Sequence, residues 1–139
     1  LERNIRGGER VLDYGCGSGI LAVAALKLGA AAARGVDIDS QALVAARANA
    51  MQNRVCAEFI APGAEAGFDA DVVAANILAN PLIALAPLIA AATRPGGHVL
   101  LSGILPEQCA AVGHAYSPWY RMDPPVIDEG WALVTGRRE

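Results

Sequence analysis

Two kinds of apolar pattern follow one another along the chain. Short, nearly continuous apolar runs that end at glycine or polar residues predict strands at residues 10–14, 33–37, 56–60, 69–76, 98–102, 120–123 and 131–136. Longer segments, in which apolar side chains recur at helical spacing, predict helices at residues 19–28, 40–52, 81–93 and 106–116. Residues 61–67 are rich in glycine and proline and predict a loop.

The order of these segments predicts the fold class. Strands that alternate with helices are typical of an α/β protein with a doubly wound, mostly parallel sheet and right-handed crossovers. We expect a seven-stranded sheet whose first strands are covered on both faces, because these runs are nearly all apolar. The last two strands have no helix between them, which predicts an antiparallel hairpin at one edge. No linker divides the chain, so residues 1–139 are expected to form one domain.

One apolar stretch is long enough to resemble a membrane span. Residues 72–92 are 21 residues without Lys, Arg, Asp or Glu. Two asparagines and two prolines interrupt them, and Asn80-Pro81 has the pattern of a helix N-cap followed by proline in the first turn. A buried strand, a short loop and a new helix explain the stretch better than a membrane helix, so no membrane partner is expected.

Charge and composition exclude other classes. The chain has 139 residues, of which 54% are apolar, and this apolar content excludes a disordered protein. Its 11 Lys and Arg against 14 Asp and Glu give a net charge of −3. Because it has no basic excess, we expect no direct contact with nucleic acid.

The spacing of the cysteines and the composition of the first residues indicate the cellular compartment. Cys16, Cys56 and Cys109 are odd in number and widely spaced, which is typical of reduced thiols and not of disulfides or a zinc site. The first residues contain no apolar signal-peptide segment. These features predict a cytoplasmic protein. The first residue is Leu1 and not Met, so the chain is expected to be a fragment or a processed product.

The strongest functional pattern is a glycine motif, D-x-G-x-G-x-G, at residues 13–19. It follows a predicted strand and opens a predicted helix, where open α/β sheets bind ligands. Gly15, Gly17 and Gly19 let the backbone turn sharply and lie close to a ligand. The dinucleotide fingerprint requires a glycine where this chain has Ile20. The spacing therefore favours S-adenosylmethionine over a ligand with a pyrophosphate on the loop; the alternative is a turn that binds nothing.

Acidic residues near the motif are the next candidates. Asp37 ends the second predicted strand, 22 residues after Gly15, where a carboxylate can accept hydrogen bonds from ribose hydroxyls. Ile38 follows it and is taken as a further cofactor contact. Asp39 is better placed to cap the next helix. Asp13 is a cofactor-site candidate that either contacts the ligand or holds the glycine loop through backbone N–H groups.

Asn76 is the candidate catalytic residue. It ends the fourth predicted strand, which neighbours the first strand in a doubly wound sheet, so we expect it beside Gly15 and the cofactor. Its side chain could accept hydrogen bonds from an incoming amine; the alternative is that Asn76 merely caps the next helix. Asn80 is the better cap, which favours a functional Asn76. Ser102 and Gly103 end the fifth strand and are expected on the far side of the same pocket.

The remaining candidates are weaker. His98 and His114 lack metal-ligand spacing, and no metal site is expected. Cys16 lies in the glycine motif without a neighbouring base, so it is not expected to act as a nucleophile. The tryptophans of the last strands are expected to pack in the core or at an edge.

Five segments together closely resemble one family: residues 11–30, 35–43, 72–87 with its N-I-L-A tetrapeptide, 96–108 and 130–138. It is the family of bacterial methyltransferases that modify the eleventh large-subunit ribosomal protein, the PrmA family. The resemblance implies a Rossmann-like methyltransferase fold, S-adenosylmethionine as methyl donor, and lysine side chains and the N-terminal α-amine of that ribosomal protein as acceptors. Carried over by position, it implies that Gly15 contacts the cofactor, Asp37 holds its ribose and Asn76 lies between cofactor and acceptor amine.

The resemblance also sets further expectations. Family members carry an N-terminal domain that docks the substrate and a Gly-Thr-Gly-x-His-x-Thr-Thr segment before the catalytic strand. Neither occurs in the 139 residues, so we expect a catalytic domain from a longer protein. Three alternatives stay open: a methyltransferase for another protein or a small-molecule amine, a nicotinamide-dependent oxidoreductase, and a non-catalytic cofactor-binding module.

Overall fold

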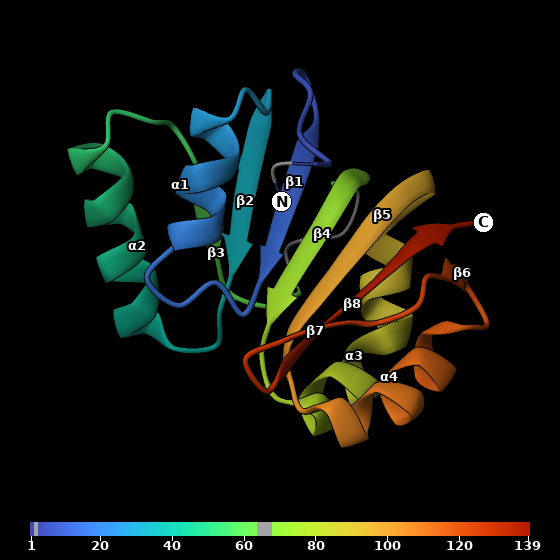
Figure 1. The fold of residues 1–139 in the computed structure, drawn as a ribbon. Helices are drawn as coiled ribbons and strands as arrows, with labels where there is room; N and C mark the ends of the chain where they lie inside the picture. Colours follow the sequence, from blue (N-terminus) through green and yellow to red (C-terminus); the bar gives the residue numbers. More distant parts are fainter. Residues whose placement is uncertain (2, 64–67) are drawn as a thin grey trace.

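Helices cover both faces of a central sheet in the computed structural model, which describes residues 1, 3–63 and 68–139 (Figure 1). Most of the predicted elements are confirmed to within a few residues. The chain runs through β1 (Arg10–Tyr14), α1 (Ile20–Lys27), β2 (Ala32–Val36), α2 (Ser40–Gln52), β3 (Glu58–Ile60), β4 (Ala70–Asn76), α3 (Ala79–Ala92) and β5 (Thr93–Ile104). It continues through the 3-10 turn η1 (Pro106–Gln108), α4 (Cys109–Tyr116), β6 (Tyr120–Met122), β7 (Val126–Asp128) and β8 (Trp131–Arg138).

The sheet has the order β3-β2-β1-β4-β5-β8-β6. Neighbouring strands from β3 to β5 are parallel, and β8 is antiparallel to both β5 and β6. The predicted doubly wound sheet and its antiparallel C-terminal strands are therefore confirmed. The sequence pattern did not predict the short strand β7, which pairs with β8 across a tight turn, so the sheet has eight strands among the described residues and not the expected seven.

Alternating residues of the central strands enter two different cores. Val11 of β1 and Val72 of β4 belong to one apolar cluster, and their neighbours Leu12 and Val73 belong to the other. Helices α1 and α2 lie over the first cluster, and α3 and α4 lie on the opposite face of the sheet (Figure 1). Burial of both faces explains why these strands are nearly all apolar.

The ends of two helices test the predicted caps. Asp39 is confirmed as the N-cap of α2, because its side chain accepts a hydrogen bond from the Gln41 N–H at 2.9 Å. The predicted Asn80 cap is wrong: the N-cap of α3 is Leu78, which makes no side-chain cap hydrogen bond, and Asn80 lies in the first helical turn. The backbone N–H groups of a helix's first turn have no hydrogen-bond partner within the helix, so proline, which lacks an N–H, fits at any of these positions. The presence of Pro81 therefore does not identify Asn80 as the N-cap.

The long apolar stretch divides into β4 and α3, as its pattern predicts. In the described part of the chain, no helix has the length and apolar character needed to cross a membrane. Of the predicted loop at 61–67, residues 64–67 lie outside the described residues.

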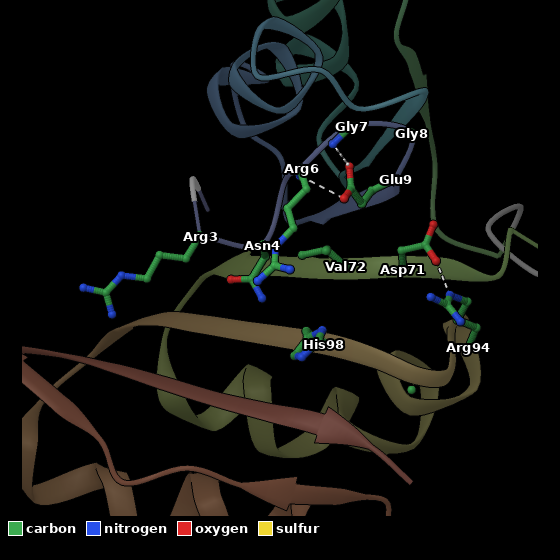
Figure 2. Close-up of a pocket in the computed structure, with 11 residues that line it drawn as sticks. Arg3, Asn4, Arg6, Gly7, Gly8, Glu9, Asp71, Val72, Arg94 and His98 are labelled. Atoms are coloured by element: carbon green, nitrogen blue, oxygen red, sulfur yellow. Dashed lines mark hydrogen bonds and ion pairs between the residues drawn. The ribbon is translucent and has the colours of Figure 1, made fainter.

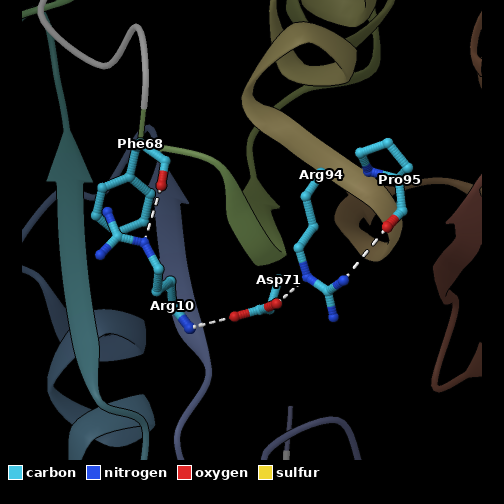
Figure 3. Close-up of polar contacts among 5 residues, drawn as sticks. All are labelled: Arg10, Phe68, Asp71, Arg94 and Pro95. Carbon is cyan, nitrogen blue, oxygen red and sulfur yellow. Dashed lines mark hydrogen bonds and ion pairs between the residues drawn. The ribbon is translucent and has the colours of Figure 1, made fainter.

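Asp71 links three segments at the amino ends of the central strands (Figure 3). Its carboxylate accepts a hydrogen bond from the Arg10 N–H at 2.8 Å and forms an ion pair with the Arg94 guanidinium. Arg10 in turn donates from Nε to the Phe68 carbonyl at 2.9 Å, and its guanidinium lies 4.4 Å from the centre of the Phe68 ring. These contacts tie β1, β4 and the start of β5 together at the edge opposite the candidate site.

Candidate active site

The first, second and fourth strands end side by side at the carboxyl edge of the sheet (Figure 1). A cavity of about 380 Å³ lies there. It is lined by Tyr14, Gly15, Val36, Asp37, Ile38, Pro62, Ile77, Leu78, Pro81 and Leu85. Three sequence candidates, Gly15, Asp37 and Ile38, therefore lie together in one cavity with mostly apolar walls, at the edge where open α/β sheets bind ligands.

Asp37 joins the two loops of this cavity. Its Oδ2 accepts a hydrogen bond from the Gly17 N–H at 2.8 Å, and its Oδ1 accepts one from the Asp39 N–H at 2.9 Å. An ionised carboxylate offers about four lone-pair positions, so each oxygen keeps capacity for one further donor. The carboxylate thus orders the glycine loop and can still accept hydrogen bonds from a ligand.

The glycines of the motif allow close packing. At Gly15, φ is +72°, and a Cβ atom would lie 2.6 Å from Cγ2 of Ile77. At Gly19, a Cβ atom would lie 2.9 Å from the Phe59 ring. Gly17 differs, because a Cβ atom there would meet nothing within 4 Å. Gly15 and Gly19 therefore fit the loop against the fold, whereas Gly17 faces open space and donates its N–H to Asp37.

Asp13 lies beneath the motif, away from the cavity lining. Its side chain is 1% exposed and accepts a hydrogen bond from the Ala22 N–H in the first turn of α1 at 3.2 Å. Burial raises the pKa of Asp13 to about 7, against the opposing effect of the Ala22 hydrogen bond. The sequence left open whether Asp13 contacts the ligand or stabilises the fold around the glycine motif. The structure favours the second role, in which Asp13 binds the backbone at the start of α1.

Asn76 is exposed at the end of β4, opposite Ser102 in the register with β5. Among the described residues, its side chain makes no hydrogen bond, and it is not part of the cavity lining. The next two residues, Ile77 and Leu78, do line the cavity. Asn76 is therefore a free polar group one residue beyond the cavity wall. Ser102 and Gly103 also lie outside the lining, contrary to expectation; the position for a Cβ atom on Gly103 instead faces Asn76.

The sequence missed much of the apolar wall. Pro62 follows β3, and Pro81 and Leu85 come from the first turns of α3. The only signal for Pro81 and Leu85 is the apolar run after Asn76, which the pattern assigned to helix burial, and Pro62 belongs to the stretch predicted as a loop.

Cys16 is buried in the apolar cluster to which α1 and α2 contribute. Burial, together with Asp13 and Asp37, raises the pKa of the Cys16 thiol to about 12, so the thiol stays protonated near neutral pH. This agrees with the expectation that it is no nucleophile. All three cysteines are free, and the described residues contain no group of three side chains suited to a metal ion.

A second, polar cavity of about 510 Å³ lies at the opposite edge of the sheet (Figure 2). Arg3, Arg6, Glu9, Asp71 and His98 are among its lining residues. Its two carboxylates are already engaged: Glu9 accepts hydrogen bonds from the backbone N–H groups of the preceding turn, and Asp71 forms the contacts described above. None of the proposed site residues lines this cavity, so the candidate site is the one at the carboxyl edge.

Comparison with known families matches all residues, 1–139, to the family described as "Ribosomal protein L11 methyltransferase (PrmA)". The chain belongs to this family. Proteins named "Ribosomal protein L11 methyltransferase" from Chromobacterium violaceum and Laribacter hongkongensis are 56% and 57% identical to it over 138 and 139 residues. Each match covers 99% of this PrmA-family chain, but 46% and 47% of the relative. The chain spans about half the length of the curated relatives it matches.

Solved structures support the same fold for this PrmA-family chain. A ribosomal protein L11 methylase from Lactobacillus delbrueckii subsp. bulgaricus is 31% identical with a TM-score of 0.87, over 99% of this chain and 74% of that one. An RNA methyltransferase from Salinibacter ruber, solved in complex with S-adenosyl-L-homocysteine, is 24% identical with a TM-score of 0.75. That match covers 94% of this chain and 80% of the other. The expected Rossmann-like methyltransferase fold is confirmed.

Proposed function

We propose that this chain is the catalytic domain of an S-adenosylmethionine-dependent methyltransferase that modifies amines of ribosomal protein L11. The observation that carries the proposal is the cavity that brings Gly15, Asp37 and Ile38 together at the carboxyl edge of the sheet. Membership of the PrmA family supports the substrate and argues against the nicotinamide alternative. The family name also supports a cytoplasmic location, where ribosomal proteins are made.

The residues present fit the proposed cofactor. Asp37 retains acceptor positions for two ribose hydroxyls after its bonds to Gly17 and Asp39. Ile38, Leu78 and the other apolar wall residues offer a surface on which the flat face of the adenine ring of S-adenosylmethionine can pack. When bound, S-adenosylmethionine supplies a methyl group on a positively charged sulfur, ready for transfer to a nucleophile.

Asn76 has the proposed task of orienting the acceptor amine. Its free side-chain oxygen can accept a hydrogen bond from the amine N–H, which fixes the direction of the nitrogen lone pair. Orientation of this kind can contribute about 7–11 kcal/mol to lowering a barrier. The role rests on the position of Asn76 at the strand end, beside cavity-lining Ile77.

The acceptor amine must be neutral to react. A lysine has an ordinary pKa of about 10.4, and desolvation against apolar residues such as Ile77 and Leu78 lowers it. Asp13 is not available as a base, because it is buried and directed at Ala22. Asp37 is already held by two backbone N–H groups. The amine proton is therefore released to water in this scheme.

A methyl-transfer assay tests the proposal. The intact protein that contains this chain is incubated with labelled S-adenosylmethionine and purified ribosomal protein L11, with an unrelated protein and free amines as other acceptors. We expect label on L11 only. Label on another acceptor alone would support the alternative substrate class, and tight cofactor binding without turnover would support a non-catalytic module.

Replacing Asn76 tests its role in the same assay. We expect Asn76→Ala to lower kcat by about 10- to 100-fold, with the affinity for S-adenosylhomocysteine unchanged. Asn80→Ala is the matched control, because Asn80 is an exposed asparagine on the same segment that caps no helix. An Asn76→Ala variant with the kcat of the Asn80→Ala variant would contradict the role of Asn76.

A further inference from the structure

Gly103 lies against the side chain of Asn76. A Cβ atom built on Gly103 would lie 2.9 Å from Oδ1 of Asn76 and 2.9 Å from the carbonyl oxygen of Ile77. Carbon and oxygen atoms do not approach so closely without something shifting. The missing side chain of Gly103 therefore leaves the space that the Asn76 amide occupies.

The backbone around Gly103 is also unusual for a strand. Its φ is +81°, in the left-handed region that favours glycine. The register between β5 and β8 shifts between Leu101 and Ile104, so Gly103 lies in a β-bulge near the carboxyl end of β5. Bulges of this kind bend a strand and change the direction of neighbouring groups, often beside active sites.

Two glycines flank the end of β4 from opposite sides. Gly15, at the end of β1, approaches Cγ2 of Ile77, and Gly103, on β5, approaches Oδ1 of Asn76. Strand β4 lies between β1 and β5 in the sheet. The dipeptide Asn76-Ile77 thus lies between two positions that lack a Cβ atom, and the absence of these atoms leaves the room that its two side chains occupy.

We propose that Gly103 is a positioning residue, which holds the Asn76 amide at the rim of the cofactor cavity by leaving room for Oδ1. The proposal rests on the proposed role of Asn76 in methyl transfer. It assigns no contact of Gly103 with cofactor or substrate. A Cβ atom at residue 103 would press on the Asn76 amide and on the Ile77 carbonyl. Neither residue 76 nor residue 103 belongs to the cavity lining, so the substitution reaches the cavity wall only through the backbone of Ile77.

Gly103→Ala in the intact protein tests the proposal, with Gly130→Ala as its matched control. Gly130 lies between β7 and β8 and has a φ of +80°, but a Cβ atom there would meet nothing within 4 Å. Both substitutions place a Cβ atom at a similar positive φ, but only Gly103→Ala meets the Asn76 amide and the Ile77 carbonyl. We expect Gly103→Ala to lower kcat for methyl transfer by about 10- to 100-fold. KM for S-adenosylmethionine should stay within about twofold of the wild-type value, and Gly130→Ala should keep the wild-type kcat.

The double variant separates this proposal from the role of Asn76. If Gly103 acts through Asn76, Gly103→Ala should lower kcat little further in an Asn76→Ala background. Equal losses of kcat in the two backgrounds, or the same kcat for Gly103→Ala and Gly130→Ala, would overturn the positioning role. In either case a large effect of Asn76→Ala alone would leave the proposed function standing. No effect of Asn76→Ala would refute the catalytic role itself.

Folding provides a second measurement if Gly103→Ala does not give a soluble protein. Removal of the Asn76 side chain should then recover part of the lost stability in the double variant, measured by circular dichroism and urea unfolding, while the contact with the Ile77 carbonyl remains. A double variant that is no better folded than Gly103→Ala would contradict the contact with Asn76 as a reason for glycine at residue 103.

Discussion

Individual side chains at the carboxyl edge of the sheet serve the fold and the proposed chemistry together. Asp37 shows this most clearly, because the oxygens expected to receive ribose hydroxyls already accept the N–H groups of Gly17 and Asp39. The residue next but one, Asp39, has the same chemistry and a different task, since its carboxylate caps α2. The proposed ligand-binding role of Asp37 and the helix-capping role of Asp39 are therefore carried by two carboxylates within three residues of chain.

Substitution of both residues gives a matched test. Asp37→Asn loses the charge and one of the two acceptor oxygens. Charge-assisted hydrogen bonds contribute about 1.5–3 kcal/mol each, so we expect a 10- to 100-fold weaker affinity for S-adenosylhomocysteine by isothermal titration calorimetry. Asp39→Asn should bind it with the wild-type affinity, because asparagine is an equally good N-cap. Equal affinities of the two variants would show that Asp37 does not bind the ligand.

Elements are tied together at the edge of the sheet that lies opposite the candidate site. Asp71, on β4, holds the start of β1 through the Arg10 N–H and the start of β5 through Arg94 (Figure 3). The carboxyl ends of the same strands carry the glycine loop and Asn76. A packed amino edge thus fixes the strands whose other ends form the cavity.

We expect the two contacts of Asp71 to differ in strength. Asp71→Ala leaves the Arg10 N–H without its partner and should lower the free energy of unfolding by about 1–2 kcal/mol. Arg94→Ala removes a half-exposed ion pair and should lower it by less than about 1 kcal/mol. Urea unfolding of both variants measures the difference. An equal or larger loss for Arg94→Ala would place the stabilisation in the ion pair and not in the backbone hydrogen bond.

The stability of the whole molecule is linked to pH through Asp13. The pKa of its buried carboxyl is raised from an ordinary value of 3.8 to about 7 in the folded protein. The folded state therefore holds a proton that the unfolded state has released between these two values. This contribution to stability is fully present below pH 3.8 and is lost as pH rises through 7.

Asp13→Asn tests this linkage. The variant should come closest to the stability of the wild type near pH 4, because Asp13 is then uncharged in the folded wild type and partly protonated in the unfolded one. At pH 8 the variant should be the more stable, since the wild type loses up to about 1.4 kcal/mol per pH unit through this group as pH rises from 3.8 to about 7. Urea unfolding at the two pH values gives the comparison, and the same pH dependence in both proteins would contradict the raised pKa.

The local patterns of the sequence determined the order of strands and helices and the parallel arrangement of the sheet. They also determined that the candidate site lies at the carboxyl ends of the strands. They did so because alternation, helical spacing and the glycine motif each act within a few residues of chain. Asp37 followed from the same logic, since its distance from Gly15 places both at neighbouring strand ends. Only the tertiary structure showed that Leu78 and not Asn80 caps α3. The structure alone also revealed the bond between Asp71 and Arg10 and the packing of Gly103 against Asn76. Two of these features are contacts between residues far apart in sequence, which no local pattern encodes. The third is the exact residue at which a helix begins, which local patterns indicate only to within a few residues.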